Sequence, residues 1–168
     1  MTQEKREFED WLDCARKAKR VALLAHISPD GDTLGSTLAL RLAFLAMGKQ
    51  VDVICDGDVP DNLKFLTGSE SILHPEDVNG SDYDTAIAVD VSDRSLLGKS
   101  EAVFDAAGIR MVIDHHATNP AYGQVNFIRG GESACCLLAY EAICGLGVEI
   151  TKDIGTCLLT GMSTDTGH

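Results

Sequence analysis

Histidine and aspartate residues follow three apolar segments of the sequence, and these residue types bind divalent metal ions. His26 follows the first segment, and Asp30 and Asp32 lie in the turn after it. Asp90 follows a second segment, and the acidic and imidazole triplet at 114–116 follows a third. Carboxylate and imidazole together suit Mn²⁺, with Mg²⁺, Fe²⁺, Co²⁺ or Zn²⁺ as alternatives. The pattern therefore predicts a metal centre.

The number of candidate ligands favours two metal ions over one. A single catalytic ion keeps open positions for water and substrate, so it does not use this many protein groups. Two ions roughly 3.5–4 Å apart, sharing a bridging carboxylate, are the arrangement of many phosphatases and nucleases. Such a pair activates a water molecule and stabilises charge on the departing oxygen. The predicted chemistry is hydrolysis of a phosphoester.

Each of these residues also has a structural explanation when it is taken alone. Asp32 could be the N-cap of a helix that starts near Thr33, and the sequence PDGD is ordinary in turns. A histidine at a strand end is often only hydrogen-bonded. Several carboxylates at one edge of a sheet, however, repel one another unless cations neutralise them. The set as a whole therefore favours metal binding.

The elements that must position these residues alternate between strand and helix patterns. Short apolar runs predict strands over residues 21–26, 50–55, 83–91, 109–113 and 124–128. Helical periodicity predicts helices over residues 4–18, 33–47, 133–144 (with Ser133 as N-cap) and 151–160. This alternation predicts an α/β fold, with a mostly parallel sheet of about five strands and helices on both faces. Ligands of such sheets bind at the carboxyl ends of the strands.

Composition and charge exclude several classes of protein. The 168 residues are 45% hydrophobic, which is enough for one well-cored domain. The formal net charge of −12 argues against a basic face that tracks long duplex nucleic acid. Six scattered cysteines indicate buried free thiols, and no apolar run reaches the roughly 20 residues that span a bilayer. With a charged N-terminus that lacks a signal peptide, a cytoplasmic location is expected.

Four segments resemble the signature segments of the DHH phosphoesterases of the RecJ-like superfamily, in the same order. They are HISPDGDTLGS, AVDVSD, VIDHH and STDTG, and they cover nearly the whole chain. The segments IDHHATNPAYGQVNFI and GESACCLLAYEAI resemble the small bacterial branch of the family. That branch degrades very short oligoribonucleotides and dephosphorylates 3′-phosphoadenosine 5′-phosphate, and some members cleave dinucleotides. The resemblance implies the N-terminal catalytic domain of such an enzyme.

The resemblance implies a centre of two divalent ions, with Mn²⁺ preferred and Mg²⁺, Co²⁺ or Fe²⁺ as alternatives. His26 and Asp30 would bind one metal, and Asp90 would bridge the two. A short oligonucleotide or a nucleotide phosphate would be the substrate. No membrane partner is implied, and a homodimer stays open.

The same resemblance assigns the second metal and the catalytic groups. Asp32, His115 and Asp165 would bind the second metal, although Asp165 lies on no predicted strand. His116 would face the phosphate as a hydrogen-bond donor or charge stabiliser. Asp114 would orient a histidine from behind.

A second domain is expected to complete the working cleft. Members of the family carry a C-terminal domain with a glycine-rich, basic patch that grips the substrate. Residues 1–168 are therefore expected to be the catalytic domain of a longer protein. Alone, the domain would bind metals and turn over slowly, since remote binding energy often drives the chemical step.

Three other functions compete with this interpretation. Hydrolysis of inorganic pyrophosphate or polyphosphate uses a similar metal set in a related branch. A metal-binding regulatory domain with little turnover is a second alternative. A receiver domain also clusters carboxylates at a sheet edge, but it needs a lysine near a late strand, and Lys152 opens a predicted helix instead.

Polar residues around the predicted site are weaker candidates. Asn119 and Arg129 follow the triplet and could contact a phosphate or a base. Asp93 and Arg94 follow the third strand, where they either approach the site or form an ion pair in solvent.

Overall fold

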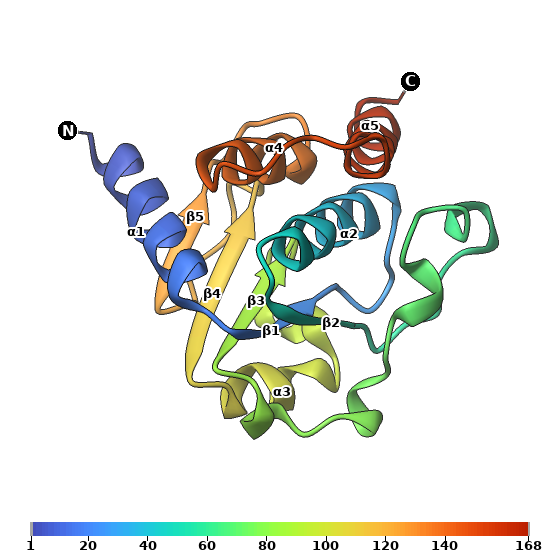
Figure 1. The fold of residues 1–168 in the computed structure, drawn as a ribbon, viewed down its shortest axis with the longest axis horizontal. Helices are drawn as coiled ribbons and strands as arrows, with labels where there is room; N and C mark the ends of the chain where they lie inside the picture. Colours follow the sequence, from blue (N-terminus) through green and yellow to red (C-terminus); the bar gives the residue numbers. More distant parts are fainter. Residues whose placement is uncertain (1, 168) are drawn as a thin grey trace.

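The computed structural model describes residues 2–167, and five parallel strands form one sheet within them (Figure 1). The strands are β1 Arg20–Leu24, β2 Gln50–Ile54, β3 Thr85–Val89, β4 Ile109–Asp114 and β5 Val125–Ile128. Their order in the sheet is β2-β1-β3-β4-β5, and every neighbouring pair is parallel. The predicted α/β fold with a parallel sheet of about five strands is confirmed.

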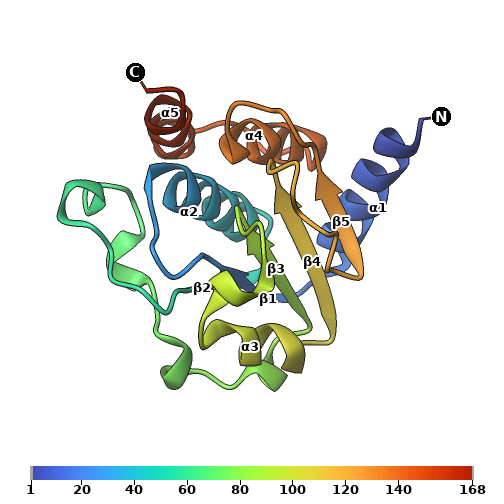
Figure 2. The ribbon, with the colours of Figure 1, turned by 180° about the vertical axis from the view of Figure 1, so that it is seen from behind.

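Helices cover both faces of the sheet, as predicted, but the two layers are unequal (Figures 1 and 2). The helices are α1 Gln3–Lys17, α2 Gly31–Ala46, α3 Ser100–Ala106, α4 Cys135–Gly145 and α5 Lys152–Thr166. On one face α1 packs against β5, α2 against β1 and β2, and α4 against β4. Helix α5 lies on α2 and α4, while α3 lies on the opposite face.

Both faces of the central strands are buried, which explains their nearly continuous apolar sequences. Along β1, Val21 and Leu23 contact the large core under α1, α2 and α4. Ala22 and Leu24 point to the opposite side and join the smaller core around Phe104 of α3. A strand that is buried on both sides needs no polar alternation.

The strand order places a topological switch point between β1 and β3. From β1 the chain crosses to β2 on one side, and it later returns to β3 on the other side. Connections that leave in opposite directions open a crevice at the carboxyl ends of the two strands, where ligands of doubly wound sheets bind. His26 lies two residues beyond the end of β1, and Asp90 directly follows β3. Two of the predicted ligands therefore lie at this crevice.

Three features of the helices differ from the sequence-based expectations. Helix α3 was not predicted, because its seven residues are too few for a clear 3.6-residue period. Helix α4 begins at Cys135 after Ala134, and Ser133 is not its N-cap. Helix α5 continues to Thr166 instead of ending near residue 160.

The last turns of α5 contain threonines whose side chains bond within the helix. Thr160, Thr164 and Thr166 each donate a hydroxyl hydrogen bond to the carbonyl oxygen four residues earlier. Serine, threonine and glycine usually favour loops, so the composition of the segment GMSTDT is typical of a helix end. In the fold the hydroxyls of Thr164 and Thr166 are satisfied within the helix. The last turn of α5 therefore carries Asp165.

Glycines allow α2 and α5 to approach closely. A Cβ atom at Gly35 of α2 would lie 2.5 Å from the carbonyl oxygen of Cys157 in α5. A Cβ atom at Gly161 of α5 would lie 2.9 Å from the Cα atom of Asp32 and would also meet the Cys136 sulfur. This close contact brings the end of α5 to the beginning of α2. It thereby brings Asp165 to the carboxyl edge of the sheet.

No helix among residues 2–167 has both the length and the apolar character that a membrane crossing requires.

We predict that two glycine substitutions in α5 have opposite effects on stability. Gly161→Ala should lower the free energy of unfolding by about 1–3 kcal/mol, because the new methyl group overpacks the contact with α2. Gly155→Ala should raise it by up to about 1 kcal/mol, since alanine favours a helix and the nearest atom to the new methyl group, on Ile150, is 3.9 Å away. Urea denaturation measures both changes. A Gly161→Ala variant as stable as the wild type would contradict the close packing of α2 on α5.

Candidate metal centre

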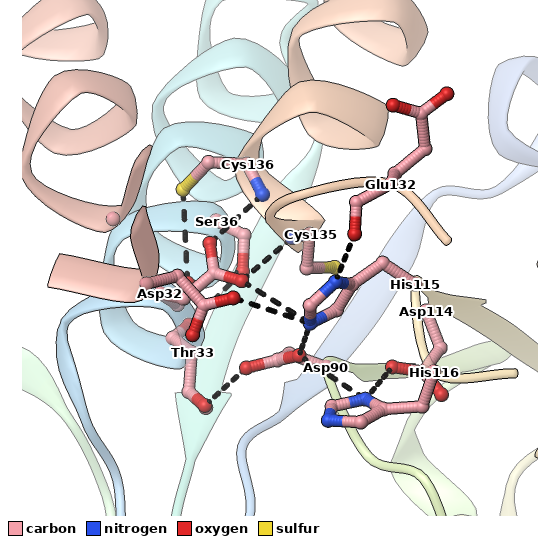
Figure 3. Close-up of polar contacts among 12 residues, drawn as sticks. Asp32, Thr33, Ser36, Asp90, Asp114, His115, His116, Glu132, Cys135 and Cys136 are labelled. Atoms are coloured by element: carbon pink, nitrogen blue, oxygen red, sulfur yellow. Dashed lines mark hydrogen bonds and ion pairs between the residues drawn. The ribbon is translucent and has the colours of Figure 1, made fainter. Parts of the chain in front are cut away.

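Asp90 is a buried carboxylate at the centre of the candidate site (Figure 3). Its side chain is 4% exposed, and its backbone has a φ of 60°, a left-handed conformation that is uncommon outside glycine. The Oδ2 atom accepts a 2.6 Å hydrogen bond from the hydroxyl of Thr33. The Oδ1 atom has no hydrogen-bond partner among the described residues. Burial, with the nearby charge of Asp32, raises the pKa of Asp90 well above its ordinary value.

His115 presents a lone pair to three carboxylates. Its Nδ1 atom lies 2.9 Å from the carbonyl oxygen of Glu132, which can only accept, so Nδ1 carries the proton of the neutral ring. The Nε2 atom then faces Asp90 Oδ1 at 3.5 Å and Oδ2 atoms of Asp32 and Asp165, each at 3.7 Å. A lone pair and three carboxylates repel one another. A cation between them would turn this repulsion into binding.

Asp32 is fixed by the beginning of α4 (Figure 3). Its Oδ2 atom accepts a 2.6 Å hydrogen bond from the amide of Cys135, and Oδ1 accepts one of 2.9 Å from the amide of Cys136. The expectation that Asp32 caps its own helix is therefore wrong, and so is the assignment of Ser133 as N-cap of α4. A carboxylate at a helix N-terminus is favoured by the free amides and the helix dipole. Burial nevertheless raises the pKa of Asp32, and the two amides oppose that rise.

Asp30 is the N-cap of α2 and keeps one oxygen free for other contacts. Its Oδ1 atom accepts hydrogen bonds from the amides of Asp32 and Thr33, at 3.0 and 2.9 Å. Its Oδ2 atom lies 3.9 Å from Nε2 of His26. Burial lowers the pKa of His26, against the opposing effect of Asp30, and so favours the neutral ring that binds metals.

The tautomer of His26 differs from that of His115. The amide of Ser28 donates a 3.3 Å hydrogen bond to His26 Nδ1, so the proton of the neutral ring lies on Nε2. Metal binding through Nε2 would need this proton to move. The neutral ring of His115 already presents the lone pair of Nε2 to a metal, whereas the neutral ring of His26 does not.

Asp165 reaches the site from the last turn of α5. Its side chain is 33% exposed, and its Oδ2 atom lies 3.7 Å from His115 Nε2. A negative charge at a helix C-terminus is unfavourable, because the helix dipole is negative there. A bound cation would offset both this charge and those of the neighbouring carboxylates.

The predicted ligands form compact groups within the described residues. In each group, one ligand atom per residue lies within 4.8 Å of the others, and the groups are His26, Asp30 and Asp90; Asp32, His115 and Asp165; and Asp90, His115 and His116. The first two groups match the two ligand sets that the family resemblance implies, with Asp90 beside both. The buried Oδ1 atom of Asp90, which has no hydrogen-bond partner among the described residues, favours the binding of a cation here. The residues therefore fit two divalent ions, while the individual ligand roles stay predictions.

His116 is held by Asp114 from behind (Figure 3). Its Nδ1 atom lies 2.7 Å from Asp114 Oδ1, and the carboxylate makes Nδ1 the donor. Nδ1 is thus occupied, which leaves Nε2 free to act. The His116 side chain is 43% exposed and lines the same cleft as the candidate ligands. Both predicted roles, His116 toward a phosphate and Asp114 behind it, agree with this geometry and stay predictions.

Asn119 supports Asp114 instead of facing a substrate. Its Nδ2 atom donates to Asp114 Oδ2 at 2.7 Å and to the carbonyl oxygen of Val91 at 3.0 Å. Tyr122 donates a 2.8 Å hydrogen bond to the same carbonyl, and burial raises the pKa of its hydroxyl. Both oxygens of the fully buried Asp114 are therefore satisfied. The hydrogen bonds of Asn119 within the protein therefore oppose the expected phosphate or base contact.

Two arginines near the site are bound to carboxylates. Arg129 forms two hydrogen bonds with Glu141, at 2.7 and 2.9 Å, which opposes the predicted phosphate contact. Arg94 donates to both oxygens of Asp105 and pairs with Glu101, so it forms an ion pair at the surface. Neither guanidinium is free to meet a substrate.

All the candidate ligands except Asp32 line a cleft of about 270 Å³. Six of its lining residues are His26, Asp30, Asp90, His115, His116 and Asp165. No lysine or arginine of the described chain is among the lining residues. Any negative charge of a substrate in this cleft therefore has to be balanced by bound cations or by groups from elsewhere.

Sequence reasoning missed three groups that hold the site together. They are the hydroxyl of Thr33, the carbonyl of Glu132 and the side-chain amide of Asn119. Thr33 and Asp90 are 57 positions apart in the sequence, so no local pattern reveals their contact. Only Asn119 was a candidate, in a different role.

Comparisons with known proteins identify relatives of this chain. The chain is 33% identical over 148 residues to a bifunctional oligoribonuclease and PAP phosphatase of Thermus thermophilus, covering 88% of this chain and 44% of that protein. It is 24% identical over 153 residues to a probable manganese-dependent inorganic pyrophosphatase of Streptococcus mutans, covering 88% and 48% of the two. The chain spans about half the length of these curated relatives.

A solved structure and a family model extend this similarity. The crystal structure of an exopolyphosphatase-related protein from Bacteroides fragilis matches with a TM-score of 0.90 and 26% identity, over 99% of this chain and 52% of that one. The model of the DHH family, N-terminal domain, matches residues 20–162. This chain therefore belongs to the DHH family of phosphoesterases and contains its N-terminal domain.

Proposed function

We propose that this domain hydrolyses short oligoribonucleotides, dinucleotides or 3′-phosphoadenosine 5′-phosphate with two bound divalent ions, preferably Mn²⁺. The buried, unpartnered Oδ1 atom of Asp90, between two groups of metal-ligating side chains, is the observation that carries the proposal. The more similar of the two curated relatives, an oligoribonuclease and PAP phosphatase, supports the choice of substrate.

The side chains of the domain would bind, orient and exchange protons around the scissile phosphate. Bound divalent ions would supply an activated water molecule and neutralise charge on the phosphate. His116, with Nδ1 held by Asp114, would direct Nε2 toward a phosphate oxygen and, as the doubly protonated imidazolium, donate a hydrogen bond to it. Asn119 would keep Asp114 in place, and the Glu132 carbonyl would keep the lone pair of His115 on Nε2.

Partners and location are also proposed. The net charge of −12 and a cleft without lysine or arginine among its described lining residues support short substrates over long duplexes. We propose that a C-terminal substrate-binding domain completes the cleft and that the protein acts in the cytoplasm. A homodimer and a merely regulatory role of the metal site stay predictions.

Hydrolysis of inorganic pyrophosphate is the second candidate function. The similarity to a probable manganese-dependent inorganic pyrophosphatase favours it, although the identity is lower, at 24%. Both reactions would use the same ligand residues. The two functions therefore differ in the substrate and not in the metal centre.

We predict release of mononucleotides from a dinucleotide in the presence of Mn²⁺, at a higher kcat/KM than release of phosphate from pyrophosphate. Parallel assays with both substrates, with and without a chelator, measure this preference. The chelator should abolish both activities, because the proposed ions supply the activated water. Cleavage of pyrophosphate alone would favour the second candidate and contradict the first.

We predict that Asp90→Asn stabilises the metal-free protein and removes its response to Mn²⁺. The folded-state pKa of Asp90 is raised, so ionisation of this group destabilises the fold as pH rises above the unfolded value of about 4. At pH 7 the free energy of unfolding of the variant should exceed that of the wild type by on the order of 1–3 kcal/mol. The amide oxygen of the new side chain should still accept the hydrogen bond from Thr33. At a pH near 4 the variant and the wild type should have the same free energy of unfolding.

Thermal unfolding with and without Mn²⁺ tests this prediction. Wild-type protein should be stabilised by Mn²⁺, and the variant should respond much less, because it lacks the proposed bridging carboxylate. Asp10→Asn, at an exposed position of α1, is the matched control and should change neither property. An Asp90→Asn variant that is stabilised by Mn²⁺ like the wild type would exclude Asp90 as a ligand.

We predict that Asn119→Ala lowers kcat about 10- to 100-fold with little change in bound metal, because it removes a hydrogen bond that positions Asp114. The proton on His116 Nδ1 should also exchange faster with water and lose its NMR signal. Asn62→Ala, at an exposed position, is the control. Loss of metal together with activity would show that Asn119 supports the ligands and not His116.

A further inference from the structure

Two apolar side chains line the candidate metal cleft without any part in its chemistry. Ile27 and Leu96 lie on the same cleft as His116 and Asp165. Both are large, and they are 39% and 37% exposed. Single exposed apolar residues are common on protein surfaces. Here two of them come together at a cleft whose other described lining residues are ionisable or carry hydroxyl groups.

The backbone holds these two residues side by side. The amide of Ile27 donates a 2.8 Å hydrogen bond to the carbonyl oxygen of Leu96, although the residues are far apart in the sequence. A Cβ atom at Gly98 would lie 2.5 Å from Cγ2 of Ile27, so the Ile27 side chain lies directly against that glycine. The Lys99 amide in turn donates a 2.9 Å hydrogen bond to Asp56 Oδ2. Three segments of the chain therefore fix the pair, which we call the apolar rim (Ile27 and Leu96).

The chemistry of the rim distinguishes between the candidate substrates. Water contacts its exposed surface at a cost, so an apolar ligand group that covers the surface gains binding energy. When the phosphate of a nucleotide substrate lies at the metal centre, the base and the ribose of that nucleotide lie close to the cleft. The faces of a base are flat and largely apolar. Inorganic pyrophosphate has no group that could use this surface.

We infer that the apolar rim binds the base or ribose next to the scissile phosphate and thereby favours nucleotide esters over inorganic pyrophosphate. This inference rests on the proposed function and names two residues that would decide between its two candidate substrates. The rim supplies aliphatic contacts and no hydrogen-bonding side chain. It should therefore hold different bases with similar affinity, as flat apolar contacts usually do.

The test compares binding of adenosine 5′-monophosphate and inorganic pyrophosphate to Mn²⁺-loaded protein by isothermal titration calorimetry. The variants are Ile27→Ser and Leu96→Ser, singly and together. Each single change should weaken binding of the nucleotide about three- to tenfold, because it removes apolar contact area. Binding of pyrophosphate and of Mn²⁺ should change less than about twofold, since neither gains from apolar contact. Ile27→Leu, which keeps the apolar surface, should behave like the wild type.

Leu159→Ser is the matched control, because Leu159 is a 67% exposed leucine of α5 that is not among the residues lining the cleft. It should leave the affinities for both ligands unchanged. A second readout, with diamagnetic Mg²⁺ in place of Mn²⁺, is the methyl NMR spectrum, in which the nucleotide should shift the Ile27 and Leu96 signals by ring currents and pyrophosphate should not.

Two different failures can be told apart. If the wild type cleaves a dinucleotide but the rim variants bind nucleotide as well as it does, the inference is wrong and the proposed function stands. Equal weakening of nucleotide and pyrophosphate would overturn the inference in the same way. If the wild type binds and cleaves only pyrophosphate, the proposed function fails, and the inference fails with it.

Discussion

Repulsion between buried carboxylates is the constraint on which this structure depends. Asp32 and Asp90 are almost completely buried, and Asp165 and Asp30 approach them from two helix ends. Taking charges of one sign out of water is costly, and the cost rises when they lie close together. The fold nevertheless holds all four on the carboxyl edge of its sheet. Such an arrangement opposes stability in the metal-free protein and favours the binding of cations.

Backbone amides at helix N-termini fix two of the carboxylates at this edge of the sheet. Asp30 caps α2 with one oxygen, and Asp32 binds the first amides of α4 with both. The two amides favour the charged form of Asp32 and so offset part of the cost of its burial. Among the described residues, only the hydroxyl of Thr33 donates a hydrogen bond to the side chain of Asp90. The site is thus rigid around a carboxylate whose remaining oxygen is still unpaired, which is how preorganised binding sites are built.

Local patterns in the sequence predict most of the fold but only part of the site. Apolar runs locate the strands, and parallel strands end at one edge, so His26, Asp90 and His115 could be brought together from the sequence. The place of Asp165 could not, since α5 continues through a segment with the composition of a loop. The contact between Asp32 and α4 joins residues 103 positions apart. A contact of that kind depends on how helices pack, and no local period reports it.

The charges of the cleft determine which groups could bind the phosphate of a substrate and which could bind the rest of it. Among the described residues, its walls offer carboxylates, imidazoles, hydroxyls and two apolar side chains, with no lysine or arginine. The nearby guanidiniums of Arg94 and Arg129 are held by acidic partners. A phosphate group could therefore approach these carboxylates only with cations between them, so that the same ions would relieve the repulsion within the fold and attract the substrate. Within the described cleft, recognition of whatever the phosphate is attached to would come from uncharged contacts, which Ile27 and Leu96 are placed to provide.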